Sequence, residues 1–370
     1  MNRLLNIIIL LLGLCIFFDT KAFAQDKTNV IWGHTAINGM KNRPDILVDN
    51  EILSVVAETV DKKLKELSIN EELPFIIKDS DNSFTEDISV DGGITLIPLV
   101  MDDHYFLSEY KILDKTFYKA VLMSQIDIIF CYYPGAGDRL RILNVVPLAG
   151  YSEIGENGEC TEPITKEKLK QEFIQNIKVL INQEMRFTNN KIFKNMDLKT
   201  VTPDTYQVTS VKVSSESANK FYGDNINIVK ALIGSSYTSA LAASHPELTI
   251  LPSVEGGNWE ESAAKQTYVL SLGDTGKYLT LEKGSNEIIL DLTKISSFNI
   301  PLKRDVGVYK KIGFAAELDN VNTGKFYRGL TERTYLAKNI NSVKYDIQGI
   351  MAQLLTDTAK NLAKSEEIEK

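Results

Sequence analysis

The sequence predicts an α+β fold of the α/β sandwich type, with two similar domains that each pack a mixed sheet against two main helices. Two observations support this fold class. Each half of the chain follows the order strand, helix, several strands, helix, and matching helices repeat their apolar positions at offsets of 174 to 177 residues. Hydrophobic residues make up 44% of the chain, a share typical of folded globular proteins, so we expect a folded and not a disordered chain.

The chain opens with a predicted signal peptide over residues 1–24. Arg3 supplies a short basic region, Leu4–Phe18 is an almost unbroken apolar run, and Ala22–Ala24 forms an A-x-A cleavage site before Gln25. The apolar run is shorter than the roughly 20 residues that a membrane span needs. We therefore expect a periplasmic or secreted protein that is mature from Gln25, with an uncleaved N-terminal anchor as the alternative.

The composition of the mature chain limits its partners. No second long apolar run occurs, so no membrane span is expected after cleavage. Cleavage removes two basic residues and one acidic residue, which changes the formal net charge from −8 to −9. Binding to nucleic acid needs clustered Lys and Arg, whereas the basic residues here are scattered. Nucleic acid is therefore not an expected partner.

The first half begins with a helix expected over residues 49–67, where apolar residues follow the i, i+3, i+4, i+7 spacing of one buried face. Asp49 or Asn50 is expected to cap it by accepting hydrogen bonds from the first turn. The later elements are a strand, the two arms of a hairpin and a closing helix capped by Thr165: 94–100, 118–133, 140–148 and 165–181.

The second half repeats this order. An alternating strand at 206–213 precedes a helix whose apolar face runs from Val229 to Leu241, with Asp224 or Asn225 as its cap. The later elements are two strands, the two arms of a hairpin and a closing helix: 268–272, 287–292, 308–318, 326–336 and 343–355. Gly and Asn in the hairpin turn accept the positive φ angles that such turns require.

These elements divide the chain into four segments. The signal peptide covers 1–24, the first α/β domain 25–187, a linker 188–205 and the second α/β domain 206–370. The linker is predicted because its residues are mostly polar. The alternative is one enlarged domain, since amphipathic helices in any α/β protein share a period.

The element order resembles the small α/β domain shared by the amino-terminal part of TolB, the curli-secretion lipoprotein and the penicillin-binding-protein activator lipoproteins. The similarity covers residues 29–185 and again 205–364, and it consists of element order alone. The chain departs from this group because it lacks a lipobox. The resemblance implies a role in envelope assembly, or as an adaptor, without catalysis.

Two cysteines, Cys131 and Cys160, remain after signal cleavage. In an oxidising compartment this number suggests one disulfide. Cys160 lies in the loop 151–164, which has no counterpart in the second half, and the bond would attach this loop to the strand that carries Cys131. Closing a loop of about 30 residues would stabilise the fold by about 3–4 kcal/mol. The alternative is a pair of buried free thiols.

The sequence predicts no catalytic, cofactor or metal site. Its histidines, His34, His104 and His245, form no H-x-x-x-H pair. The stretch Asp102–His104 comes nearest to a metal cluster, but successive strand residues point to opposite faces. The acidic stretch 79–87 lacks the Gly and the closing Glu of a calcium loop. No nucleophile elbow or phosphate-binding loop occurs.

We therefore expect a non-enzymatic protein of the cell envelope that binds other envelope proteins or assembles with itself. Open sheet edges and helix faces are the surfaces that such modules offer to partners. The alternative is a periplasmic solute-binding protein with a ligand cleft between two lobes. Such lobes usually alternate strands and helices, whereas here the strands cluster between two helices.

Overall fold

The computed structural model describes most of the chain beyond residue 26. The described residues are 27–33, 35–37, 47–69, 73–78, 93–112, 115–133, 139–155, 160–183, 193–194, 196, 198, 205–255, 260–262, 267–271, 278–301, 309–336 and 346–367. The predicted signal peptide, His34 and the acidic stretch 79–87 lie outside them.

The described residues form two β-sheets. The first has ten strands: β1 (Thr28–Trp32), β2 (Ala36–Ile37), β3 (Phe75–Lys78), β4 (Gly93–Asp102), β5 (Tyr105–Ile112), β6 (Lys115–Tyr133), β7 (Arg139–Ile154), β10 (Glu260–Ser262), β11 (Thr267–Ser271) and β12 (Tyr278–Glu282). The second has five: β8 (Thr205–Lys212), β9 (Thr249–Ile250), β13 (Asn286–Ile300), β14 (Tyr309–Asn320) and β15 (Phe326–Leu336). The α-helices in the described residues are α2 (Asn50–Ile69), α3 (Lys166–Gln183), α5 (Glu216–Tyr222), α6 (Ile226–Ser244) and α7 (Asp346–Ser365). This content confirms the predicted α+β sandwich.

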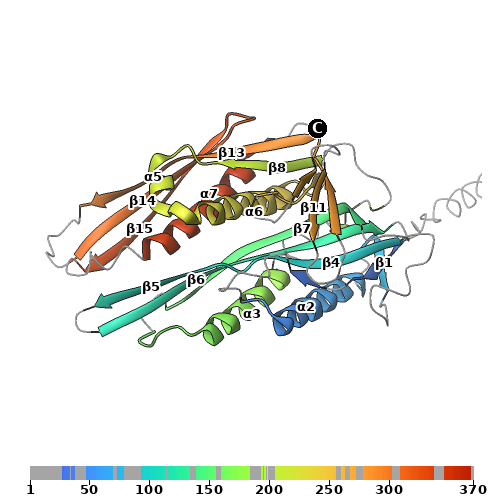
Figure 1. Cartoon of the computed structure of the whole chain (residues 1–370), viewed down its shortest axis with the longest axis horizontal. Helices are drawn as coiled ribbons and strands as arrows, with labels where there is room; N and C mark the ends of the chain where they lie inside the picture. The colour runs from blue at the N-terminus through green and yellow to red at the C-terminus, as the bar shows by residue number, and fades with distance from the viewer. Residues whose placement is uncertain are drawn as a thin grey trace, which may run out of the picture.

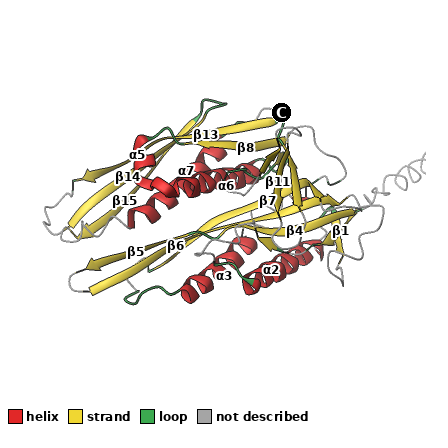
Figure 2. Ribbon diagram, in the orientation of Figure 1, coloured by secondary structure: helices red, strands yellow, loops and turns green. Residues whose placement is uncertain are grey.

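Sheets and helices stack in four layers. In the view of Figure 1 the five-stranded sheet lies above α6 and α7, and these two helices lie above the ten-stranded sheet. The helices α2 and α3 cover the other face of the ten-stranded sheet, as the colours of Figure 2 make clear. One helix pair is therefore enclosed between two sheets. Within the described residues, no helix has the length and apolar character needed to span a membrane.

The two sheets share one strand order. Five strands of the first sheet follow the path β7-β6-β4-β1-β3, and the second sheet follows β15-β14-β13-β8-β9. The first strand of each half runs parallel to both of its neighbours. The pairs β4–β6 and β6–β7 of the first path are antiparallel, and so are the pairs β13–β14 and β14–β15 of the second. The order strand, helix, several strands, helix that the sequence predicts for each half is also found in the structure, while the division into two separate domains stays a prediction.

Three strands from the second half join the first sheet. β12 pairs in parallel with the start of β7, and β11 and β10 extend the sheet beyond it. Arg141 of β7 and Glu282 of β12 form an ion pair of 2.9 Å across this junction. The ten-stranded sheet thus contains residues from both sides of the predicted linker.

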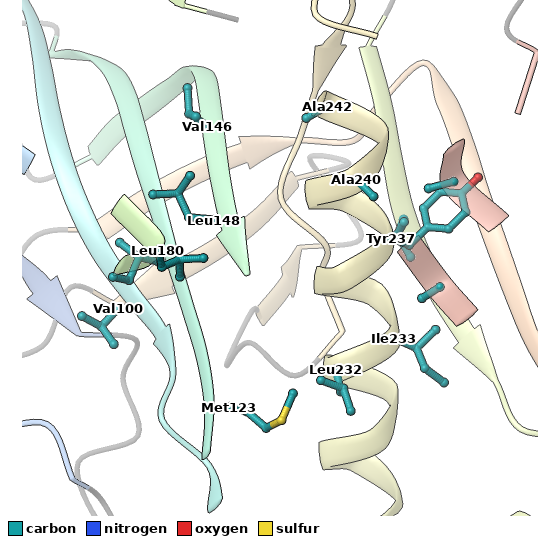
Figure 3. Close-up of a cluster of buried hydrophobic side chains, with 14 of the residues drawn as sticks. Val100, Met123, Val146, Leu148, Leu180, Leu232, Ile233, Tyr237, Ala240 and Ala242 are labelled. Atoms are coloured by element: carbon teal, nitrogen blue, oxygen red, sulfur yellow. The ribbon is translucent and has the colours of Figure 1, made fainter. Parts of the chain in front are cut away.

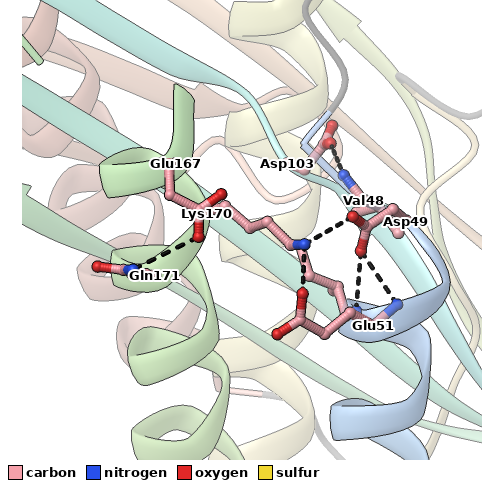
Figure 4. A network of polar contacts seen from close by, with 8 residues as sticks. Val48, Asp49, Glu51, Asp103, Glu167, Lys170 and Gln171 are labelled. Carbon is pink, nitrogen blue, oxygen red and sulfur yellow. Dashed lines mark hydrogen bonds and ion pairs between the residues drawn. The ribbon is translucent and has the colours of Figure 1, made fainter. Parts of the chain in front are cut away.

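The helix α2 begins at one of the caps expected from the sequence. The Asp49 carboxylate accepts hydrogen bonds of 3.1 Å from the backbone N–H groups of Glu51 and Ile52. Lys170 of α3 forms ion pairs with Asp49, at 2.7 Å, and with Glu51, which joins the starts of the two helices (Figure 4). Thr165 caps α3 as predicted, by accepting from its first turn.

The helix α6 fills the space between the sheets. Of its 19 residues, 13 are buried, as expected for a helix that contacts protein on all sides. Leu232 points toward Met123 of the first sheet, and Tyr237 points toward the second sheet (Figure 3). On α7, a Cβ atom at Gly349 would lie 2.7 Å from Val121 Cγ2, so glycine allows the close packing of α7 on β6.

The segment predicted as a polar linker contributes to the core. Phe193 is fully buried, and its ring lies 6.5 Å from that of Phe75 and 6.4 Å from that of Phe130, measured between centroids. Met196 and Leu198 are also buried. The described part of this segment therefore packs on the first sheet.

Candidate functional site

The last strand of the second sheet, β15, has an open edge. It pairs with β14 along its whole length on one side, and no described residue pairs with its other side. Its solvent-facing side chains alternate along the strand: Phe326, Arg328, Leu330, Glu332 and Thr334. Phe326 is 65% exposed and Leu330 is 62% exposed, although both side chains are large and apolar. An edge of this kind can accept an added strand.

The equivalent edge in the first half already carries an added strand. β7 has the position in the first sheet that β15 has in the second, and β12 pairs with β7 at residues 139–141. Strand addition at this position is therefore part of the fold. In the described part of the chain, no strand plays the role of β12 beside β15.

A cleft of about 280 Å³ lies beside this edge, between β15, α7 and the end of β7. The consecutive residues Gly329, Leu330 and Thr331 all line it. The other described residues that line it belong to β15, to α7 and to β7, and none belongs to β14, so the cleft lies on the open side of β15. The cleft therefore borders the unpaired backbone of β15.

The cleft contains a buried polar group that has no partner. Gln353 of α7 is 6% exposed, and its Nε2 atom has no hydrogen-bond partner. Leaving such a group unsatisfied costs about 1–3 kcal/mol. One turn along α7, burial raises the pKa of the Asp357 carboxyl, while Lys360 and Lys364 oppose this shift. A ligand that brings a hydrogen-bond acceptor, such as a peptide carbonyl, would satisfy Gln353.

Gly329 determines how closely β15 approaches α7. A Cβ atom at this position would lie 2.1 Å from Thr358 Oγ1 and 3.0 Å from Leu354 Cδ1. Both of these side chains also line the cleft. The absence of a side chain at Gly329 therefore keeps the strand edge directly against the helix that carries Gln353.

The structure does not bring together the two cysteines that were predicted to form a disulfide. Both thiols are free and buried. The backbone N–H of Tyr118 donates to the Cys160 carbonyl at 2.9 Å, whereas Cys131 lies 13 residues further along β6. That length of strand spans roughly 43 Å. The bond is absent because β7 runs antiparallel to β6 and carries the loop with Cys160 away from Cys131.

Cys160 lines a second hollow, of about 550 Å³, together with Glu153 and Lys168. The thiol donates to the Glu162 carbonyl at 3.2 Å and accepts from the Lys168 ammonium group at 3.3 Å. Glu153 forms an ion pair of 3.0 Å with Lys119 of β6. The Cys160 thiol and the Glu153 carboxylate therefore both have partners inside the chain.

The stretch Asp102–His104, considered above for a metal cluster, has a structural contact. The Asp103 carboxylate accepts from the backbone N–H of Leu47 at 2.6 Å. It also accepts from the backbone N–H of Val48 at 3.1 Å (Figure 4). These bonds hold the segment before α2 against the turn that follows β4. Among the residues that the structure describes, no three His, Cys, Asp or Glu side chains lie close enough together to bind a metal ion.

The contact between the two halves is packed with side chains. A ligand held between two lobes would lie at this seam, where α6 faces the first sheet (Figure 3). Leu232 is buried there, and the Ser239 hydroxyl donates to the Pro147 carbonyl of β7 at 3.1 Å. Along this face of α6, the described part of the seam therefore resembles a protein core more than a ligand cleft.

From the sequence, residues 326–336 are predicted as a strand without a function. The signal that marks this strand is the pair Phe326 and Leu330, two large apolar residues on its otherwise polar face. Gln353 gives no such signal in the sequence, because the lack of a hydrogen-bond partner for its Nε2 atom depends on how α7 packs against β15.

Comparison with known proteins adds no family or relative. No protein-family model matches the chain, and no curated protein is significantly similar to it.

Proposed function

We propose that this protein is an exported, non-enzymatic interaction or assembly module of the cell envelope, which binds a protein partner by strand addition at β15. The observation that carries the proposal is the open edge of β15 beside the unpartnered amide of Gln353. An added strand would supply backbone groups to the edge and carbonyl groups to Gln353, and its apolar side chains would cover Phe326 and Leu330.

Three further features support this proposal. The signal-like sequence at residues 1–24 supports export to the envelope. The added strand on β7 shows that the fold accommodates strand addition at the equivalent edge. The element order resembles that of the TolB, curli-secretion and penicillin-binding-protein activator domains, which favours an assembly or adaptor role.

Site-specific photocrosslinking in cells that export the protein tests the proposal. A benzophenone amino acid at Leu330, on the β15 edge, is expected to give protein adducts that are resolved as discrete bands and identified by mass spectrometry. The matched control is Val179 of α3, an apolar residue that is also exposed, to 48%. Protein adducts at Leu330 without matching adducts at Val179 support the proposal.

Two outcomes contradict the proposal. One is the absence of protein adducts at Leu330 under conditions in which a known envelope complex is crosslinked. The other is the same set of adducts at Leu330 and at Val179, because β15 would then be no more than one exposed surface among others.

A further inference from the structure

We infer that the strand added at β15 is β15 of a second copy of this chain, antiparallel to the first and related to it by a twofold axis. This inference rests on the proposed strand addition at β15 and names its partner. A twofold axis brings a surface against itself, so the surface must be self-complementary. The exposed row of β15 meets this requirement.

The complementarity follows from the order of five side chains: Phe326, Arg328, Leu330, Glu332 and Thr334. With the axis at Leu330, this residue meets Leu330 of the partner subunit. Arg328 then lies opposite Glu332 of the partner subunit, and Glu332 lies opposite Arg328 of the partner subunit. Opposite charges and apolar pairs directly across an antiparallel pair both stabilise it.

Other positions of the axis lose this match. With the axis at Gly329, Arg328 faces Leu330 of the partner subunit, and with the axis at Thr331, Glu332 faces that same leucine. With the axis at Arg328 or at Glu332, like charges meet, which destabilises a strand pair. Among these registers, the one centred on Leu330 is therefore the register that pairs opposite charges and brings no like charges together.

Both charges are accessible for this pairing. Arg328 is exposed and forms no ion pair within the described residues, although Glu317 lies opposite it on β14. Glu332 contacts Lys311 of β14, and its side chain remains 56% exposed. A second copy would give Arg328 a carboxylate partner and would place a second cation beside Glu332.

The same pairing completes the cleft. On the face of β15 toward α7, Gly329 would lie opposite Thr331 of the partner subunit, and Tyr327 opposite Arg333 of the partner subunit. The backbone of the second β15 would then form the missing wall beside Gln353. The two five-stranded sheets would join into one continuous sheet across the dimer.

Sedimentation velocity of the purified protein tests the charge pattern. The unmodified protein is expected to show a concentration-dependent dimer. Arg328→Glu or Glu332→Arg alone should weaken dimerisation roughly tenfold, because each substitution acts twice in a twofold dimer. The double variant Arg328→Glu with Glu332→Arg should recover dimerisation. Lys220→Glu, a charge reversal on the exposed part of α5, is the matched control and should leave the dimer unchanged.

Thiol crosslinking tests the register. In the dimer centred on Leu330, the two Leu330→Cys residues lie about 5 Å apart, and a short bismaleimide should join them. Two Phe326→Cys residues would lie about 27 Å apart, so this variant should stay uncrosslinked. The unmodified protein controls for the buried thiols of Cys131 and Cys160.

Three results overturn the inference. They are a monomer at the highest concentration reached, a double charge variant as weak as the singles, or crosslinking of Phe326→Cys in preference to Leu330→Cys. The proposed function fails separately. If the photocrosslinks at Leu330 contain other envelope proteins while the purified chain is monomeric, the strand-addition site stands and the second copy is the wrong partner.

Discussion

At pH 8, replacement of Asp127 by Asn is expected to raise the unfolding free energy by up to about 4 kcal/mol more than the same replacement does at pH 3. Asp127 lies in the middle of β6 and is fully buried. Its Oδ1 atom accepts from Gln125 at 3.2 Å, and its Oδ2 atom has no hydrogen-bond partner. Alternation along β6 places it on the face of Met123, toward α6.

The direction of this pH effect follows from the shifted pKa. Burial raises the pKa of Asp127 from its ordinary value of 3.8 to about 7, although the hydrogen bond from Gln125 opposes the shift. Between these values the folded protein keeps a proton that the unfolded chain has lost. The stabilising contribution of this carboxyl is therefore complete below about pH 4 and is lost as the pH rises through 7.

Urea unfolding of both proteins between pH 3 and pH 8 measures the effect as a widening difference in unfolding free energy. The pH-dependent contributions of the other carboxylates are the same in both proteins, so they cancel in this difference. Glu109→Gln, a neutralisation on the exposed surface of β5, is the matched control and should show no such divergence. A difference between Asp127→Asn and the unmodified protein that stays constant with pH would mean that Asp127 keeps its ordinary pKa.

Phe193→Ala is expected to lower the unfolding free energy by about 3–5 kcal/mol. Phe193 is fully buried against Phe75 and Phe130, so its loss removes apolar burial and leaves a cavity between two rings. Phe193 belongs to a stretch whose polar composition suggests a linker, which makes the prediction a sharp test of the fold.

Chemical denaturation of purified Phe193→Ala gives this value directly. Ile69→Ala is the matched control, because Ile69 is apolar but 81% exposed at the end of α2, and it should change stability by less than about 0.5 kcal/mol. Similar small effects for both variants would show that the segment around Phe193 is not part of the core.

The local elements could be predicted from the sequence because neighbouring residues determine them. The apolar spacing and the Asp49 cap predict α2 to within two residues at its C-terminal end, since both signals lie within the helix itself. The predicted second arm of the hairpin, 326–336, matches β15 at both ends. Gly324 lies in the preceding turn with a φ of 70°. Repetition of these local patterns also predicts the order of elements in the two halves.

The long-range arrangement could not be predicted in this way. β12 pairs with β7 although more than 130 positions separate their paired residues in the sequence, and neither strand has a sequence pattern that identifies the other as its partner. Phe193 is the single aromatic residue of the mostly polar segment 188–205, and the few apolar residues near it do not follow a clear helix or strand period that would indicate its burial. A bond between Cys131 and Cys160 requires the loop after β7 to return to the middle of β6, whereas the antiparallel pairing carries this loop to the start of that strand.

The candidate site combines both kinds of information. The exposed row of β15 is readable in the sequence once the strand is placed, because alternate residues share a face. The open edge and the isolation of Gln353 are properties of strand order and of the contact between β15 and α7. Neither property is encoded in a short motif.

Amide hydrogen exchange tests most directly the claim that β15 is the binding edge. The protein is compared in its free and its assembled state, the latter formed at high concentration or with a partner recovered from the Leu330 crosslinks. We expect new protection at alternate amides of β15 (Phe326–Leu336), the ones that point away from β14, while the edge strand β5 (Tyr105–Ile112) exchanges as before. Unchanged exchange along β15, with new protection at β5 or another edge, would contradict the assignment.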